Sequence, residues 1–283
     1  MKLARPDVFH PRIVLAGCPQ QVAGDGDDAA LVAALRQRGL HARWLSWDHP
    51  DTGQADLVIL RATHDYPSRL NEFLSWTTGV QNLLNPPAVV SWNVDRRYLA
   101  DLAARGVPTV PGQAYAAGDR VELPHSGVVF VSPAVGTGTR CFTTRSAAAA
   151  RVAELHAAGQ RVLVQPAGAD PQTVLVFLGG APSHAFSTQG AFFEQALRQA
   201  EPDFEIWDVG AAALAAAADP GALLYARVHL IGSRVLELQL VDPSLGWRRL
   251  DGGTRDLAQR QFAVCVESAL ERLGLGPLSH RGP

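Results

Sequence analysis

The sequence predicts an α/β protein that begins with a parallel sheet and continues into lobes of mixed α+β structure. Through residues 1–90, short aliphatic runs such as Arg12–Gly17 alternate with segments of helical spacing, which is typical of a parallel, doubly wound sheet. Farther on, Gly232 and Ser233 separate two apolar runs, and a two-residue turn of this kind suits an antiparallel pair. Because 283 residues exceed what one hydrophobic core usually organises, the length predicts either one large α/β domain or two to three small lobes.

An N-terminal domain is expected over residues 1–90. Its predicted strands are residues 12–17, 41–47, 56–60 and 88–92, and its predicted helices are residues 27–38 and 70–76. Gly39 stands directly after the first of these helices, where a left-handed residue commonly ends a helix.

A central lobe is expected over residues 91–165 and a C-terminal lobe over 166–283. A helix over 95–105 is followed by Pro108 and Pro111, which force an extended chain and mark the boundary region. The other elements expected in the central lobe are strand 128–131, a Gly/Thr turn at 136–139, helix 146–158 and strand 161–165. The C-terminal lobe is expected to hold strands 173–178, a return strand from His184, strands 223–231 and 234–240, and helices 211–218 and 257–273.

Composition and charge exclude several classes of protein. With 47% hydrophobic and 18% charged residues the chain is globular, and a net charge of −2 argues against broad nucleic-acid or anionic-membrane binding. The apolar runs are too short to cross a bilayer and the N-terminus lacks an apolar signal core, so we expect a cytoplasmic protein. The three cysteines form no CxxC pair, which argues against a disulfide framework or a structural zinc site. Lys2 is the single lysine, so nearly all positive charge comes from arginine.

Several motifs occur in an order and spacing that resemble one superfamily. They are RATHDY at 61–66, LNP at 84–86, WNVDRRYL at 92–99, GVP at 106–108, the paired strands over 225–239, and DPS at 242–244. Together these segments resemble the ATP-grasp superfamily, in particular the carboxylate-amine ligases similar to glutathione synthetase and to ribosomal-protein glutamate ligases. The resemblance covers nearly the whole chain.

The resemblance implies an ATP-grasp fold, with an N-terminal pre-ATP-grasp parallel-sheet domain and two α+β lobes that hold ATP between them. Such ligases activate a carboxylate as an acyl phosphate, which an amine then attacks. ATP and Mg²⁺ are the implied cofactors, since cations must hold the triphosphate and oxygen ligands must hold the metal. The nucleotide-binding residues implied by the resemblance are Arg96, Ser132, Gly136, Thr137, Gly138, Arg140, Gln165 and Arg227.

Several positions depart from the family pattern. Arg96 and Ser132 stand where the family has lysines, and Gln172 stands where it has an acidic residue. Ser187 or Thr188 occupies the place of the basic residue that would stabilise the transferring phosphate. Since each lost charge contact to a phosphate is expensive for catalysis, these changes predict lost or altered ATP chemistry.

The metal positions have changed as well. Glu237 falls on the family's metal-binding glutamate, Gln239 falls where an asparagine or glutamate is usual, and His229 falls where an aspartate is usual. Imidazole is a poor ligand for Mg²⁺ and a better one for a transition metal. Two alternatives remain open: these residues bind a transition metal, or they hydrogen-bond one another in a site that holds no metal.

The sequence therefore leaves three functions open: a ligase-like protein with lost or altered ATP chemistry, an active ATP-dependent ligase in which arginine replaces lysine, and a transition-metal-dependent enzyme. The partner is expected to be a small-molecule or peptide substrate, and the predicted substrate-binding residues are Arg61, His64, Asp65 and Tyr66. Related folds often pair through the first lobe, so a homodimer is expected.

Overall fold

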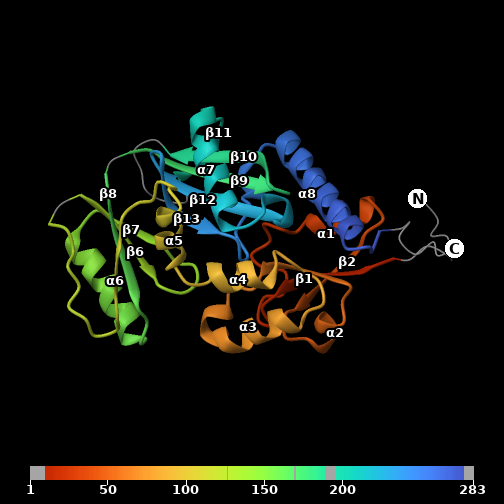
Figure 1. Cartoon of the computed structure of the whole chain (residues 1–283), viewed down its shortest axis with the longest axis horizontal. Helices are drawn as coiled ribbons and strands as arrows, with labels where there is room; N and C mark the ends of the chain where they lie inside the picture. Colours follow the sequence, from red (N-terminus) through yellow and green to blue (C-terminus); the bar gives the residue numbers. More distant parts are fainter. Residues whose placement is uncertain (1–9, 126, 169, 189–195, 277–283) are drawn as a thin grey trace.

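The computed structural model describes residues 10–125, 127–168, 170–188 and 196–276 (Figure 1). Three separate sheets organise these residues, one in each of an N-terminal, a central and a C-terminal lobe. Lys2 lies outside the described residues. The exact residues at which one lobe ends and the next begins stay a prediction.

The N-terminal lobe is built on a parallel sheet of strand order β2-β1-β3-β4, as the alternating pattern predicted. Its strands are β1 (Arg12–Gly17), β2 (His41–Ser46), β3 (Leu57–Ala62) and β4 (Leu83–Leu84). Its helices are α1 (Leu31–Gln37), α2 (Pro50–Gly53), the 3₁₀ turn η1 (Tyr66–Arg69), α3 (Leu70–Gly79) and α4 (Pro87–Asn93). Every residue of β3 is buried, as expected for a central strand covered on both faces.

Two predictions for this region are wrong in detail. Residues 88–92 form most of helix α4 rather than a strand, because Pro87 starts a helix at its first turn and buries Val89, Val90 and Asn93 on one side. Helix α1 begins at Leu31, since residues 27–30 form turns and Asp27 and Asp28 bind the C-terminal lobe. The apolar run at 88–92 could be assigned to either state because its length suits both.

The central lobe is an antiparallel sheet of order β5-β8-β6-β7 with one covering helix. Its strands are β5 (Gln113–Tyr115), β6 (Val128–Pro133), β7 (Arg140–Phe142) and β8 (Val162–Ala167), and the helix is α6 (Arg145–Ala157). The Thr144 side chain caps α6 by accepting a hydrogen bond from the Ala147 N–H. The predicted helix over 95–105 is α5 (Tyr98–Ala104), which precedes the strands of this sheet in the sequence.

The C-terminal lobe is an antiparallel sheet of order β11-β10-β9-β12-β13. Its strands are β9 (Gln172–Leu178), β10 (Ala181–Thr188), β11 (Arg198–Ala200), β12 (Tyr225–Ile231) and β13 (Arg234–Gln239). Its helices are α7 (Phe204–Ala217), α8 (Gly252–Arg272) and the 3₁₀ turns η3 (Pro220–Ala222) and η4 (Trp247–Arg249). Gly232, with φ of 56°, takes the left-handed conformation in the predicted turn between β12 and β13.

Two layers of apolar side chains hold the C-terminal sheet in place. One face packs on α8, which lies against α1 and joins this lobe to the N-terminal sheet (Figure 1). The opposite face packs on α7 and α5. None of the helices within the described part of the chain is long and apolar enough to cross a membrane.

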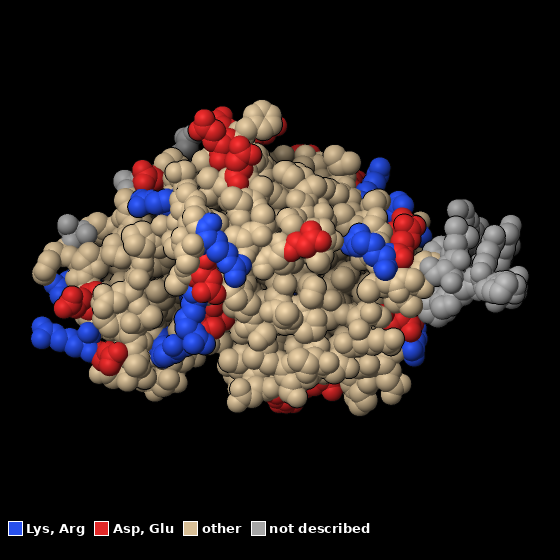
Figure 2. Space-filling view, viewed as in Figure 1, with Lys and Arg blue, Asp and Glu red and all other residues tan. Residues whose placement is uncertain are grey.

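Charged side chains of both signs are interspersed on the face drawn in Figure 2. On that face the arginines stand beside acidic residues and form no continuous basic surface. The expected lack of broad nucleic-acid binding and the expected cytoplasmic location stay predictions.

Candidate functional site

Four polar side chains lie together on strands β12 and β13. In the antiparallel register Arg227 is opposite Gln239, and His229 is opposite Glu237. Because side chains alternate along a strand, these four project to one face, while neighbours such as Val228 pack toward α7. The strand pair thus presents a polar surface on this face of the sheet.

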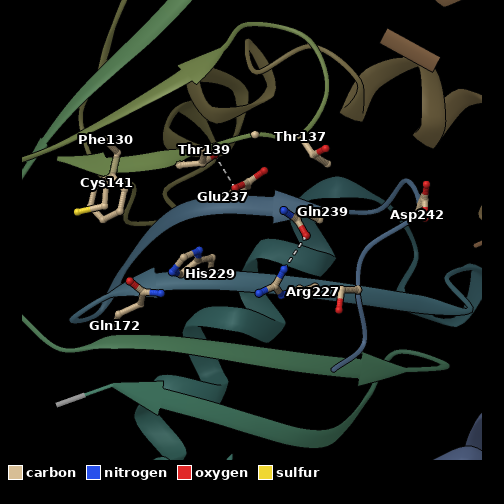
Figure 3. A pocket seen from close by; sticks show the side chains of 12 residues that line it. Phe130, Thr137, Thr139, Cys141, Gln172, Arg227, His229, Glu237, Gln239 and Asp242 are labelled. Carbon is tan, nitrogen blue, oxygen red and sulfur yellow. Dashed lines mark hydrogen bonds between the residues drawn. The ribbon is translucent and has the colours of Figure 1, made fainter. Parts of the chain in front are cut away.

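This polar surface forms one wall of a cavity of about 310 Å³ between the C-terminal and central lobes (Figure 3). The facing wall comes from β6, β7 and the Gly/Thr turn between them. We call this space the interlobe cavity. Besides the four residues above, its lining residues are Phe130, Thr137, Gly138, Thr139, Cys141, Gln172, Asp242 and Ser244.

A buried ion pair closes one side of the interlobe cavity. Arg96 is 5% exposed, and its Nη2 donates to Glu237 Oε1 at 2.7 Å and to Thr139 Oγ1 at 2.8 Å. The Thr139 hydroxyl donates to the other carboxylate oxygen, Glu237 Oε2, at 2.8 Å. Both oxygens of Glu237 therefore have donors from the protein itself.

The electrostatics of Glu237 agree with this pairing. Burial opposes its charge, but the attraction of Arg96, followed by hydrogen bonds from Gln239 and Thr139, lowers the pKa of Glu237 to about 2. The pKa of the Arg96 guanidinium is raised, since the attraction of Glu237 outweighs the opposing effect of burial. At neutral pH the pair is fully ionised and its charges cancel.

The predicted nucleotide-binding residues divide into three groups. Thr137, Gly138 and Arg227 line the interlobe cavity, and Arg227 donates to Gln239 Oε1 at 3.3 Å. Arg96 and Gly136 line a small recess beside it. A Cβ on Gly136 would lie 2.5 Å from Pro67 Cγ, so a glycine is needed where this turn approaches the N-terminal lobe.

The remaining three do not reach the interlobe cavity. Ser132 is completely buried and its hydroxyl donates to Thr139 Oγ1 at 3.1 Å. Arg140 is exposed on β7, and Gln165 is buried on β8 with its Nε2 directed to the carbonyls of Val110 and Leu236. A role in nucleotide binding stays a prediction for all eight residues.

The metal hypothesis gains no support from the arrangement. The structure brings His229, Glu237 and Gln239 to one cavity wall, as the strand pattern predicted. Among the described residues, however, no group of three or more His, Cys, Asp or Glu side chains is placed to hold a metal ion. Glu237 directs its oxygens to Arg96 and Thr139 instead.

The four predicted substrate-binding residues lie outside the lining of the interlobe cavity as far as the described residues show. Arg61 is buried and donates through Nε and Nη2 to Asp28 at 3.0 and 3.1 Å, and also to the Pro243 carbonyl at 2.9 Å. This arginine ties strand β3 to the C-terminal lobe.

The other three also contact protein groups. His64 Nε2 lies 3.2 Å from the buried Cys18 Sγ, and Asp65 accepts from Trp47 Nε1 at 3.0 Å. Tyr66 is buried and stacks on the ring of Phe73. Their assignment to a substrate stays a prediction.

A hydrophobic cluster joins the two lobes beyond the polar wall. Phe130 of β6 packs with Val110, Ile231 and Leu236, and all four are at most 2% exposed. The central sheet therefore rests directly on strands β12 and β13 at this point.

Two residues that sequence reasoning passed over are central to the site. Thr139 links Ser132, Arg96 and Glu237, whereas the prediction singled out its neighbour Arg140. Asp242 has a φ of 56°, the one left-handed residue other than glycine among those described, and burial raises its pKa to about 7. The signal for Thr139 was its hydroxyl in the Gly/Thr turn, but no pattern distinguishes it from Thr137.

Known proteins resemble the chain along most of its length. The cycloserine biosynthesis protein DcsG of Streptomyces lavendulae is 31% identical over 280 residues, which cover 83% of this chain and 92% of that protein. This chain belongs to the DcsG family. Residues 13–85 also match the family described as D-cycloserine synthetase DcsG, N-terminal domain.

Solved structures place the DcsG family within the ATP-grasp fold. The crystal structure of D-cycloserine synthetase DcsG aligns with a TM-score of 0.72 and 27% identity, covering 92% of this chain and 99% of that one. The D-alanine–D-alanine ligase of Bacillus anthracis complexed with ATP aligns with a TM-score of 0.70 and 13% identity, covering 94% and 98%. The RimK domain protein of Sphaerobacter thermophilus aligns with a TM-score of 0.63 and 18% identity, covering 90% and 99%. The predicted membership of the ATP-grasp superfamily is confirmed, and the protein is ligase-like in its family and fold.

Proposed function

We propose that this DcsG-family protein binds a small polar ligand in the interlobe cavity and has lost the usual ATP and Mg²⁺ chemistry of its fold. The observation that carries the proposal is the buried Arg96–Glu237 pair, in which both carboxylate oxygens are satisfied by Arg96 and Thr139. In the ligase site that the resemblance implies, Arg96 would contact the nucleotide and Glu237 would bind the metal. Here the two side chains pair with each other instead.

The balance of charge around the cavity supports this view. Ser132 offers no positive charge, and the Arg96 charge is matched by Glu237. Among the residues that line the cavity, Arg227 supplies the remaining arginine charge, and the same lining includes the acidic residue Asp242. A triphosphate carries several negative charges, so its desolvation would be poorly compensated by such a lining. A ligand with little or no net charge fits it better.

The donor set does not suit Mg²⁺ either. This ion requires near-octahedral oxygen ligands, whereas the wall offers the imidazole of His229, the amide of Gln239 and an already paired carboxylate. The other carboxylate of the lining, Asp242, has its pKa raised to about 7 by burial. Freeing Glu237 for a metal would leave the Arg96 guanidinium buried without its partner, which is costly. The residues present do not fit the metal that the fold family implies.

The test is nucleotide binding by the purified chain. Isothermal titration and thermal melting with ATP or ADP, each with and without Mg²⁺, should show no binding heat and no rise of the midpoint beyond that caused by the salt. Any ligand that binds the folded state selectively must raise the midpoint by mass action. A saturable rise with Mg-ATP that disappears in Glu237→Gln would refute the proposal.

Family membership favours a second candidate, an active ATP-dependent ligase in which Arg96 takes the role of the usual lysine. The observation for it is the 31% identity to a cycloserine biosynthesis protein over most of both chains. In this case Arg96 and Glu237 must separate when nucleotide and metal enter. The substrate would be a small amino-acid-like molecule, in keeping with the name of that relative.

Turnover separates the two candidates. Release of phosphate or ADP from ATP should be measured with a panel of amino acids and their amides. An active ligase would show turnover that depends on one substrate and falls at least about a hundredfold in Arg96→Met, as on removal of a transition-state charge contact. No turnover in a protein that melts cooperatively would favour the first candidate.

A further inference from the structure

We propose that a second cavity, on the other side of Arg96 from the interlobe cavity, binds a small aromatic monocarboxylate with a hydroxyl group at its far end. This cavity lies between helix α5 and strand β8 and measures about 370 Å³. We call it the α5 groove. The inference does not depend on the function proposed for the interlobe cavity.

The walls of the α5 groove are largely apolar. Leu99, Ala100 and Ala103 line it from α5, and Val110 and Leu163 line it from the opposite side. Small side chains on α5 leave the open volume, which falls in the range of small-molecule sites in proteins. A flat apolar ring suits such walls.

Two buried polar atoms belong to side chains that line the same groove. Gln165 is 0% exposed, and its Oε1 has no hydrogen-bond partner although its Nε2 binds backbone carbonyls. Arg96 is 5% exposed, and its Nη1 has no partner although its other nitrogens are bound. Buried polar groups without partners are rare because each costs free energy.

The two atoms need complementary partners, a donor for Gln165 Oε1 and an acceptor for Arg96 Nη1. A hydroxyl can donate its proton to Gln165 Oε1 and accept a hydrogen bond from Arg96 Nη1. A carboxylate could serve Arg96 but would leave Gln165 Oε1 without a donor. The chemistry therefore assigns a hydroxyl to this inner end of the ligand.

The outer end of the α5 groove is positively charged. Arg97 and Arg161 both pair with the single carboxylate of Asp95, through Oδ2 at 3.1 and 2.8 Å. The two guanidinium side chains are 77% and 44% exposed. Since Arg96 is neutralised by Glu237, this rim keeps one unit of net positive charge. A monocarboxylate at the rim balances it and can bind an arginine in bidentate fashion.

Three matched probes test the assignment. Binding of 4-hydroxybenzoate, benzoate and 4-hydroxybenzyl alcohol to the full chain should be measured by ligand-observed NMR titration. We expect 4-hydroxybenzoate to bind most tightly, with benzoate weaker by about fivefold for one lost hydrogen bond. The alcohol should be weaker by about threefold or more, because it lacks the rim ion pair.

Two variants locate the binding. Ala100→Trp fills the groove from an exposed helical position and should abolish binding of all three probes. Arg161→Gln should weaken the binding of 4-hydroxybenzoate by about threefold and leave the affinity for 4-hydroxybenzyl alcohol unchanged. Ala150→Trp, at an exposed position on α6, is the matched control and should bind like the wild type. Melting curves establish that each variant is folded.

The proposal is overturned if none of the probes binds saturably, or if Ala100→Trp binds them as well as Ala150→Trp does. It is also overturned if the alcohol binds as tightly as 4-hydroxybenzoate, because the carboxylate would then have no role.

Discussion

The described part of the chain contains two buried arginine–carboxylate pairs whose surroundings differ. Arg61 and Asp28 lie in the packed junction of the N-terminal and C-terminal lobes, and the indole Nε1 of Trp247 also donates to Asp28. Arg96 and Glu237 lie between the recess beside the cavity and the α5 groove. The first pair is surrounded by protein, whereas the second has open space on both sides.

The carboxylates respond to these surroundings in opposite directions. Desolvation raises the pKa of Asp28 in spite of Arg61, whereas Arg96, Gln239 and Thr139 together lower the pKa of Glu237 to about 2. The ion pair and hydrogen bonds thus outweigh the cost of burial at Glu237 but not at Asp28. We interpret the first pair as a structural tie between lobes. We interpret the second as an altered ligand site in which the two charged side chains bind each other.

The largest expected effect is on the structural tie. Arg61→Met should lower the free energy of unfolding by about 4 kcal/mol, because Asp28 is left buried without its partner. Urea unfolding followed by circular dichroism measures this loss. Arg12→Met at the exposed Arg12–Asp56 pair is the control and should cost less than about 1 kcal/mol. Equal losses would show that the Arg61 pair is not a special tie.

A smaller loss is expected when the second pair is broken. Glu237→Gln should cost about 2 kcal/mol, since an amide can still accept from Arg96 although the charge attraction is gone. The double variant Arg96→Met/Glu237→Leu should recover to within about 1 kcal/mol of the wild type, because apolar residues of similar size replace both charges. Additive losses in this double-mutant cycle would contradict a direct pairing.

The contribution of the Arg96–Glu237 pair to stability should disappear at acid pH. The pKa of Glu237 falls from 4.5 to about 2 on folding, so its contribution is present above pH 4.5 and is lost as the pH falls toward 2. The difference in stability between wild type and Glu237→Gln should therefore shrink over that window. Urea midpoints at a series of pH values measure it, and a constant difference would argue against an ionised, paired Glu237.

Asp242 should have the opposite effect on the pH dependence of stability, and at pH values closer to neutrality. Its folded pKa is raised from 3.8 to about 7, so the folded state binds the proton more tightly than the unfolded chain. Its effect is to make stability fall as pH rises from about 4 to 7, and Asp242→Asn should remove this fall. Melting midpoints of the two proteins at pH 5 and pH 7.5 provide the comparison. Parallel pH profiles would mean that Asp242 titrates normally.

The smallest effect concerns Thr139, whose hydroxyl bridges Glu237 and Ser132. Thr139→Val keeps the shape but removes one donor to Glu237, so a loss of about 1 kcal/mol is expected. Thr137→Val, in the same turn and exposed, should cost less than about 0.5 kcal/mol. Urea unfolding measures both losses. Equal losses for Thr139→Val and Thr137→Val would show that the Thr139 hydroxyl does not stabilise the Arg96–Glu237 pair.

Much of the site could be anticipated from strand periodicity. Arg227, His229, Glu237 and Gln239 were expected on neighbouring strands, and the register brings them to one wall. The position of Arg96 against Glu237 could not be anticipated, since the two residues are 141 positions apart in the chain. The contacts of the predicted substrate residues could not be anticipated for a related reason: Arg61 pairs with Asp28 and Tyr66 stacks on Phe73.

The amino-acid order alone was sufficient for the parallel first sheet and the antiparallel β12–β13 pair, because aliphatic spacing and turn residues act locally. The ATP-grasp fold was predicted from the resemblance of the ordered motifs to that superfamily. It also showed which phosphate and metal positions had changed type. Only the folded chain decided that residues 88–92 are helical, that Arg96 neutralises Glu237 and that Phe130 packs between the lobes. The physical reason is that charge pairing and close packing depend on distances between segments remote in sequence, which local patterns do not encode.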